Sequence, residues 1–309
     1  MNARRVSILF TILALIWGSL FVFVKIGLPH VPPVLFAALR HDIAAVLTLG
    51  YAATVTTRWY PRSRADWWLV SLGAVFFVGL YNGFLFVGQQ GVTSGVAAIL
   101  VATNPILAAL FGWVLLPQDR LSGLGIVGLA LGFLGVTLVA RPDLTPPFRS
   151  ESIGALLVVL STACLAFGSV LVQRAGSDLS TEGFVAWSNV FGALFLHGIS
   201  VGLPDESLAG VELTGAALGA ILYLGVVGSA FSAVLYFQLL DELGAVEINL
   251  VSYAAPVFTA VLGWLLLEET LSPLSVAGFL TIFVGFALVK HREMRAELRN
   301  VSDALGSSQ

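Results

Sequence analysis

The chain has 309 residues, of which 58% are hydrophobic and 11% are charged, and its formal net charge is −3. Soluble domains carry about 25% charged residues, so this composition excludes an ordinary soluble domain and predicts an integral membrane protein. The chain has one cysteine, Cys164, which excludes an intramolecular disulfide.

Apolar segments follow one another along the chain, each long enough to cross a hydrocarbon core of about 30 Å at about 1.5 Å per residue. Ten such spans are predicted, at approximately 6–28, 34–56, 67–88, 94–116, 122–140, 152–173, 181–203, 213–237, 246–267 and 273–290. The connections are short and rich in turn residues. We therefore predict an all-α membrane protein with a single transmembrane domain over residues 1–290 and a tail over 291–309.

The basic residues of the connections predict the orientation. With the N-terminus inside, eleven Lys and Arg side chains lie on the cytoplasmic side and three lie outside or at the outer boundary. Both termini are therefore expected in the cytoplasm, which is consistent with an even number of spans. The expected location is the inner membrane of a bacterial cell.

One pattern is written twice in the sequence. Residues 105–116, PILAALFGWVLL, return as residues 256–267, PVFTAVLGWLLL, with Pro, Ala, Gly, Trp and the last two Leu in register at a spacing of 151. After a one-residue slip, Gly128 and Gly135 match Gly278 and Gly285. Long-period self-similarity of this kind indicates a duplicated structural unit.

The two copies cover about 6–141 and 152–290, and each contains five spans. Five is odd, so the second copy must cross the membrane in the opposite sense to the first. Inverted repeats are typical of secondary transporters, in which two halves enclose a midplane site and give alternating access to it. A duplication kept only for packing is the alternative.

Three sequence features also match a known family. They are Trp17-Gly18-Ser19-Leu20-Phe21-Val22-Phe23-Val24-Lys25 in span one, Ala37-Ala38-Leu39-Arg40 in span two and the two Pro…Gly-Trp-x-Leu-Leu segments. With these motifs the chain resembles the drug/metabolite transporter superfamily, and in particular its ten-helix EamA-type exporters. The acid that usually follows the fourth helix of a repeat is matched by Glu268 or Glu269, but the first copy reads Pro117-Gln118-Asp119, so a structural role at the helix end is expected for it.

The resemblance implies a secondary exporter of small metabolites that works by alternating access through a central cavity. Small multidrug relatives bind cations with an acid in their first span, which this chain lacks, and sugar-phosphate relatives would need more buried basic residues than Lys25 and Arg40. Amino acids, aromatic or otherwise neutral, are the expected substrates, and aromatic amino-acid exporters are similar proteins. Drugs or another metabolite class are the alternative.

Paired prolines suggest hinges within this architecture. Pro105 and Pro256 fall about halfway through their spans, and each leaves the carbonyl four residues earlier without its usual partner. Kinks at equivalent depth would serve as hinges or expose backbone polar groups to a cavity. Simple tolerance of proline in a membrane helix is the alternative.

Span two holds the densest polar cluster, Arg40-His41-Asp42. Ionisable groups in the hydrocarbon region are costly and normally face the protein interior or water. We expect His41 to line the central cavity, as a proton-linked group or a packed histidine, while Arg40 or Asp42 makes a structural pair or reaches the outer boundary. His197 in span seven is a weaker candidate.

Further polar and aromatic side chains lie within the spans and extend the predicted cavity. They are Trp17, Tyr81, Asn82, Asn104, Trp187, Ser188, Ser252 and Tyr253. Such a lining suits a small zwitterionic or aromatic metabolite. Ordinary helix packing is the alternative for each aromatic residue alone.

Other kinds of chemistry lack the motifs that they need. Gly123-x-Gly125-x-x-Gly128 opens a membrane helix with no preceding strand, so it does not predict a nucleotide site. A Walker A motif, clustered metal ligands and a catalytic dyad are absent from the sequence, so we expect neither an enzyme nor a cofactor. The expected partners are a small-molecule substrate, the bilayer and protons as a candidate coupling ion, with no nucleic acid and with a monomer as the working unit. A non-transporting scaffold or a membrane enzyme is the alternative from another class.

Overall fold

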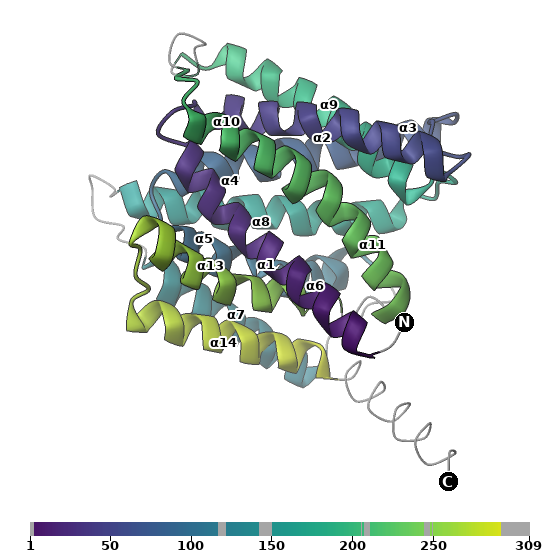
Figure 1. Cartoon of the computed structure of the whole chain (residues 1–309). Helices are drawn as coiled ribbons and strands as arrows, with labels where there is room; N and C mark the ends of the chain where they lie inside the picture. The colour runs from purple at the N-terminus through teal and green to yellow at the C-terminus, as the bar shows by residue number, and fades with distance from the viewer. Residues whose placement is uncertain are drawn as a thin grey trace.

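The structure is a computed structural model that describes residues 3–116, 122–141, 150–204, 206, 211–243, 248 and 250–291. Over these residues it is a bundle of helices without strands, most of them aligned along one common direction (Figure 1). In chain order the helices are α1 Ala3–Gly27, α2 Pro33–Val55, α3 Arg64–Leu72, η1 Gly73–Leu80, α4 Tyr81–Gln89, α5 Ser94–Val101, α6 Asn104–Leu115, α7 Gly123–Ala140, α8 Ser150–Arg174, α9 Thr181–Gly202, α10 Gly215–Leu222, η3 Tyr223–Phe231, α11 Ser232–Leu243, α13 Val251–Leu267 and α14 Pro273–Val289.

The predicted spans correspond to these helices. Within the described ranges, eight helical stretches are long and apolar enough to cross a membrane, and α13 and α14 are two shorter apolar helices. Span three is built from α3, η1 and α4, span four from α5 and α6, and span eight from α10, η3 and α11. The prediction of an all-α membrane protein is confirmed.

The bundle has two ends, which we name by the chain. The start of α1 and the end of α14 lie together at one end, here called the terminal end (Figure 1). The opposite end, where α1 ends at Gly27 and α4 ends at Gln89, is called the far end.

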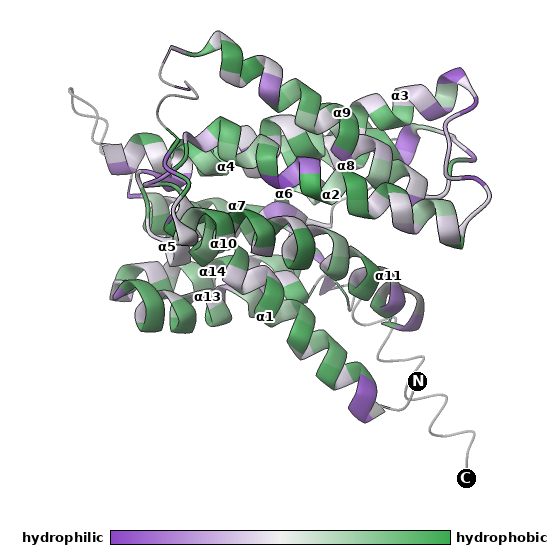
Figure 2. Cartoon of the chain, turned by 45° about the horizontal axis from the view of Figure 1, so that its top comes forward, coloured by the Kyte–Doolittle hydropathy of each residue, from purple (hydrophilic) through white to green (hydrophobic). Residues whose placement is uncertain are grey.

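The surface between the two ends is apolar. Figure 2 shows hydrophobic residues along most of the helices, with hydrophilic residues mainly near helix ends and in connections. Val46, Leu156 and Val201 are 72%, 68% and 89% exposed, while Arg40, Asn82 and Gln89 are buried. This arrangement suits lipid as the surrounding solvent, because a polar side chain in the membrane finds partners only inside the protein.

Glycines show how the two halves meet. A Cβ atom added to Gly128 of α7 would lie 2.5 Å from the Gly285 carbonyl oxygen, and one added to Gly135 would lie 2.7 Å from that of Gly278. In the repeat, Gly278 is the equivalent of Gly128 and Gly285 that of Gly135. Each glycine of α7 therefore faces the α14 equivalent of the other α7 glycine. Such reciprocal pairing is what an axis of twofold pseudosymmetry between α7 and α14 produces. The two copies are therefore related by inversion.

The start of α2 is capped from a distant part of the chain. Pro32 precedes the helix and offers no side-chain cap, but the carboxylate of Glu206 accepts hydrogen bonds from the Val34 and Leu35 backbone amides, both at 2.9 Å. Glu206 is only 8% exposed. A buried carboxylate at a helix N-terminus satisfies donors that the helix itself leaves free and interacts favourably with the helix dipole.

Replacing Glu206 by alanine is expected to lower the free energy of unfolding by about 1–3 kcal/mol, because two buried amides lose their acceptor. Melting of the purified protein in detergent measures this loss. Glu212→Ala is the matched control: its side chain is 73% exposed and lies 3.7 Å from His30, so its removal should change stability by less than about 1 kcal/mol. Equal losses for both variants would contradict the capping role.

Candidate functional site

A central cavity of about 510 Å³ lies between the two halves. This volume is within the range of about 300–1,000 Å³ that is usual for small-molecule sites. Its walls are mostly apolar, and the polar or aromatic-polar residues among its lining are Trp17, Arg40, Tyr81, Asn82, Gln89, Asn104, Thr181, Ser232, Tyr236 and Ser252. Both repeats contribute to this lining, as expected for a site between inverted halves.

The cavity extends to the terminal end of the bundle. Thr181 is the first residue of α9 and Ser252 the second residue of α13, and both helices begin at that end. At the other extreme the lining stops at Gln89, the last residue of α4.

The far end is closed above Gln89, whose side chain is fully buried. Gln89 Nε2 donates to the Phe21 carbonyl oxygen at 2.9 Å, and the Gln89 carbonyl accepts from Lys25 Nζ at 2.8 Å. Beside it the rings of Phe36 and Phe86 meet edge to face, with centroids 5.2 Å apart. These contacts join α1, α2 and α4 into a seal.

The repeat equivalents at the terminal end are not joined in this way. Whereas α4 packs against α2 and α8, its equivalent α11 packs on α1 and η3, over the described residues, rather than on α9. Tyr236, which stands 150 residues after Phe86, lines the cavity and stacks on Trp17 with ring centroids 5.7 Å apart. The two halves therefore differ in conformation: the first closes the far end and the second leaves the terminal end open.

Two π-helical segments flank the cavity at equivalent places. η1 and η3 begin 150 residues apart, at Gly73 and Tyr223. Asn82 Nδ2 donates to the Val78 carbonyl at 2.8 Å, and Ser232 Oγ donates to the equivalent Gly228 carbonyl at 2.7 Å. Long π-helical runs are rare and frequently mark functional sites. Here they end at Leu80 and Phe231, just before two cavity-lining residues, Asn82 and Ser232.

Arg40 supplies a positive charge to the wall of this cavity. Its Nη2 donates to Ser229 Oγ at 3.3 Å, and its guanidinium carbon lies 5.7 Å from the centre of the Phe86 ring. Its Nε has no hydrogen-bond partner among the described residues, and no salt bridge of the described chain involves it. Among the described residues, the buried guanidinium thus has no neutralising acid.

Amide oxygens supply acceptors in the same cavity. The side-chain oxygens of Asn82, Gln89 and Asn104 are buried and make no hydrogen bond within the described part of the chain. All three residues line the cavity together with Arg40. Buried polar groups are normally paired, so a group of unpaired ones around a cavity marks a place for a polar ligand.

Five residues that the sequence predicts for the cavity do line it. They are Trp17, Tyr81, Asn82, Asn104 and Ser252. Their roles in transport stay predictions. Sequence reasoning missed Gln89, which stands beside Gln90 at the end of a span and looks like part of a connection.

The structure places the other four candidates outside the lining. His41 Nδ1 lies 2.8 Å from Asn189 Oδ1, between α2 and α9, so Arg40 rather than His41 takes the cavity position on α2. Tyr253 packs between Phe283 and Phe286 of α14. These side chains pack between helices instead of facing the cavity.

Trp187 and Ser188 also lie elsewhere. Trp187 donates from Nε1 to the Trp59 carbonyl at 3.0 Å and stacks on the Trp59 ring, within an aromatic cluster at the terminal end. Ser188 is buried where α9 passes Gly73, with no room for a Cβ atom there. Ends of membrane helices commonly carry such aromatic belts, which explains the place of Trp187.

The two prolines have different surroundings. Pro105 lies in the first turn of α6, after a break in which α5 ends at Val101, whereas Pro256 lies inside the continuous helix α13. The expected kink in span four is therefore a helix break two residues wide. A hinge role for either proline stays a prediction.

Two acidic residues at helix surfaces have structural partners. Asp42 Oδ2 pairs with His197 Nε2 at 2.9 Å and joins α2 to α9. Glu269 accepts a hydrogen bond from the Ser94 amide at 2.9 Å and another from the Ser94 hydroxyl, so it caps the start of α5. This is the structural role expected from the sequence for the acid after the fourth helix of a repeat.

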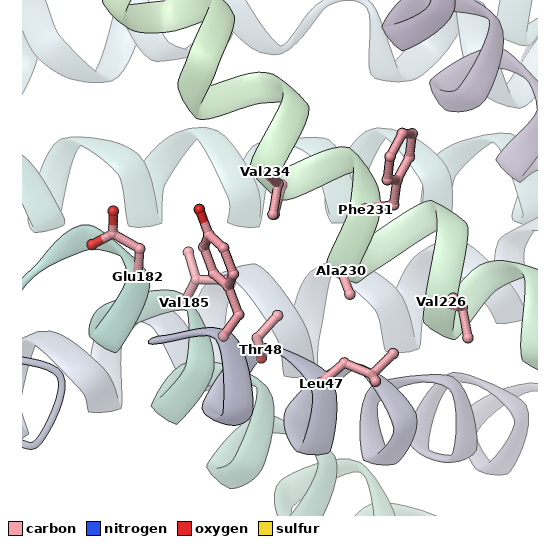
Figure 3. A pocket seen from close by; sticks show the side chains of 10 residues that line it. Leu47, Thr48, Glu182, Val185, Val226, Ala230, Phe231 and Val234 are labelled. Carbon is pink, nitrogen blue, oxygen red and sulfur yellow. The ribbon is translucent and has the colours of Figure 1, made fainter. Parts of the chain in front are cut away.

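A second, smaller groove of about 290 Å³ adjoins the cavity. Figure 3 shows Leu47 and Thr48 of α2 and Glu182 of α9 facing η3 and α11 across it. Val185 and Ala233 line both the groove and the cavity. The groove therefore lies beside α11 and leads from the apolar surface of the bundle toward the cavity.

Known proteins place this arrangement in a family. The chain is 25% identical over 285 residues to the uncharacterized transporter YvbV of Bacillus subtilis, covering 92% of this chain and 91% of that protein. It is 26% identical to protein PecM of Dickeya dadantii, covering 89% of each, and 28% identical to the uncharacterized inner membrane transporter YedA of Escherichia coli, covering 90% and 88%.

A solved crystal structure shares the fold, with a TM-score of 0.64 at 21% identity, covering 96% of this chain and 100% of that one. The sequence pattern of the EamA-like transporter family matches twice, at residues 5–141 and 152–290. These two matches coincide with the two inverted repeats and together cover most of the chain. The chain belongs to the EamA-like transporter family, within the drug/metabolite transporter superfamily.

Proposed function

We propose that this membrane transporter is a secondary exporter of small metabolites, with amino acids, aromatic or otherwise neutral, as its substrates. The observation that carries the proposal is the central cavity, which is open toward one end of the bundle and sealed at the other. A site enclosed by two inverted halves, accessible from one side at a time, is what alternating access requires.

The direction of transport follows from the charge of the connections. Most of the Lys and Arg residues in the described ranges, such as Arg58 and Arg62, lie at the terminal end, which favours a cytoplasmic location for it. The cavity would then load from the cytoplasm and release outside. The name of the relative YedA supports the inner membrane as the location.

The proposed transition exchanges the packing of two equivalent half-helices. To open the far end, α4 leaves α2 and separates Phe86 from Phe36; to close the terminal end, α11 moves onto α9 and carries Tyr236 inward. Pseudosymmetry supports this exchange, because each half then adopts the conformation that the other has now. No covalent step is involved.

The cavity walls support a small zwitterionic or aromatic substrate. Trp17, Tyr81 and Phe184 offer aromatic faces for a side chain, and Arg40 with the amide groups offers polar contacts. Export of drugs is a second candidate, favoured by the mostly apolar lining and the adjoining apolar groove. An amino-acid exporter needs polar groups on its substrates, whereas a drug exporter does not.

Flux into liposomes that contain the purified protein tests the proposal. We expect radiolabelled aromatic or neutral amino acids to exchange above the level of empty liposomes, and apolar dyes to exchange less. Absence of flux for every amino acid and dye would overturn the transporter proposal, and flux of dyes alone would favour the drug exporter.

Energy coupling is tested with the same vesicles and a pH gradient. If protons drive export, an inward-directed gradient should raise export several-fold over an equal pH on both sides. Flux that is indifferent to the gradient would contradict proton coupling and would remove His41 and the Asp42–His197 pair from any such role.

A further inference from the structure

We propose that Arg40 is the carboxylate anchor of the cavity, and that an unpaired amide oxygen among those of Asn82, Gln89 and Asn104 receives the ammonium group of the same substrate. This inference rests on the proposed function and names its substrate class: small molecules that carry a carboxylate, with zwitterionic α-amino acids bound best.

Arg40 carries a charge that its surroundings leave unbalanced. It is 8% exposed and lies about a third of the way along α2, yet its partners among the described residues are one neutral hydroxyl and one aromatic ring. A buried charge without a neutralising partner is costly, both in a protein interior and in a membrane. An anionic group that enters the cavity removes that cost, whereas a cation increases it.

Acids that could compete for Arg40 are absent from the described lining. The nearest acid along the helix, Asp42, is engaged with His197 on the opposite side of α2 from the cavity lining. The cavity lining within the described chain contains no Asp or Glu. A carboxylate in the cavity therefore meets the positive charge of Arg40, and no described acid lines that cavity; Glu182 lies in the adjoining groove.

The guanidinium of Arg40 has hydrogen-bond donors to spare. A guanidinium has five N–H donors in a planar fork that matches a carboxylate. In Arg40 the Nη2 atom is used by Ser229, while Nε has no partner among the described residues. Donors therefore remain for a charge-assisted hydrogen bond with a carboxylate oxygen.

The hydrogen-bond acceptors of the cavity are side-chain amide oxygens. Asn82 and Gln89 each use their side-chain nitrogen in a bond to a backbone carbonyl, at 2.8 Å and 2.9 Å, which turns the amide oxygen into the free group. Asn104 adds a third unpaired oxygen from α6. Asn82 and Gln89 lie seven residues apart on α4, about 10 Å along the helix, so one ammonium group contacts only one of them. A neutral amide oxygen suits an ammonium group without a carboxylate that would favour simple amines.

Binding of four probes that share a phenyl ring on a two-carbon chain and differ in its charged groups separates the contributions. The probes are L-phenylalanine, L-phenylalaninamide, 3-phenylpropionate and phenethylamine, each titrated into the detergent-purified protein while the melting temperature is recorded. Phenylalanine should bind at least about tenfold more tightly than its amide, since loss of one charge-assisted bond leaves Arg40 unpaired. 3-Phenylpropionate should bind more weakly than phenylalanine, and phenethylamine should bind least.

Variants of Arg40 test whether this residue causes the preference for phenylalanine over its amide. Arg40→Gln should abolish the preference of acid over amide, and Arg40→Lys, which keeps the charge but loses the fork, should retain part of it. Ser229→Ala is the matched control, because it removes the hydroxyl partner of Arg40 and leaves the charge, so the preference should persist. Should Arg40→Gln fail to fold, the four probes on the unaltered protein still decide.

Equal binding of phenylalanine and its amide, or no stabilisation by any probe, would overturn the carboxylate anchor. Equal binding of phenylalanine and 3-phenylpropionate would overturn the ammonium site at the amides. These outcomes are distinct from failure of the proposed function: a protein that prefers carboxylates but shows no flux keeps its anchor and is not an exporter, whereas flux without carboxylate preference keeps the exporter and rejects the anchor.

Discussion

Gly128→Leu is expected to prevent correct assembly of the two halves, with a loss of stability of about 3 kcal/mol or more, at the upper end of what overpacking costs. The obstacle to a side chain at this position is backbone: a Cβ atom would lie 2.5 Å from the Gly285 carbonyl oxygen and 2.9 Å from the Val289 amide nitrogen. Backbone cannot rotate away as a flexible side chain can, so α7 and α14 must separate. Melting in detergent, together with the yield of monodisperse protein, measures the effect.

Gly219→Leu is the matched control for this substitution. Gly219 lies in α10, and a Cβ atom there would meet nothing within 4 Å. The leucine would project toward lipid, so the melting temperature should stay close to that of the unaltered protein. If the two leucines are equally harmful, the effect belongs to glycine replacement in general and the close contact of α7 and α14 is not decisive.

The fold could be predicted because its signals are long and redundant. Ten apolar runs predict the helices. The repeat is visible in glycines at matched positions, which are Gly128, Gly135, Gly278 and Gly285. The structure explains why glycine stands at all four: each removes a side chain from the place where the halves cross. Because each repeat has an odd number of spans, the second repeat must cross the membrane in the opposite sense to the first.

The cavity could be predicted only in part, because a helix that is apolar on nearly all faces gives little information about which side faces inward. Neighbouring residues on a helix point about 100° apart, so a small error in phase exchanges Arg40 for His41. In the structure Arg40 lines the cavity and His41 contacts Asn189. The contacts of α2 with α9 and η3, which set this phase, are not visible in the sequence of α2 alone.

The π-helical segments had no sequence signal strong enough to predict them. Their register depends on carbonyl groups that find partners in Asn82, Ser229 and Ser232. In hindsight, Asn82 and Ser232 stand 150 residues apart, as polar residues at equivalent positions of two apolar spans. Comparison of polar positions between the two copies would have selected both cavity-lining residues together.

A single cysteine at Ser252 is expected to react with a membrane-impermeant maleimide from the terminal side at least about tenfold faster than from the far side. Ser252 lines the cavity at its terminal end, while Gln89, Phe36 and Phe86 seal the far end. The less stable of two conformations is typically populated at about 0.1–10%, which sets the expected ratio of rates. The native Cys164 is replaced by alanine so that only the introduced thiol reacts.

Leu203→Cys in the same background is the matched control. Leu203 follows α9 at the far end and is 43% exposed, so its cysteine should react from the opposite side of the membrane. This control identifies the two sides without any assumption about orientation in the cell. Equal labelling of Ser252→Cys from both sides would show that the far-end seal formed by α1, α2 and α4 does not govern access to the cavity. Protection of Ser252→Cys from the terminal side by added L-phenylalanine would connect that access to the site around Arg40, because a ligand held there lies between the reagent and the thiol.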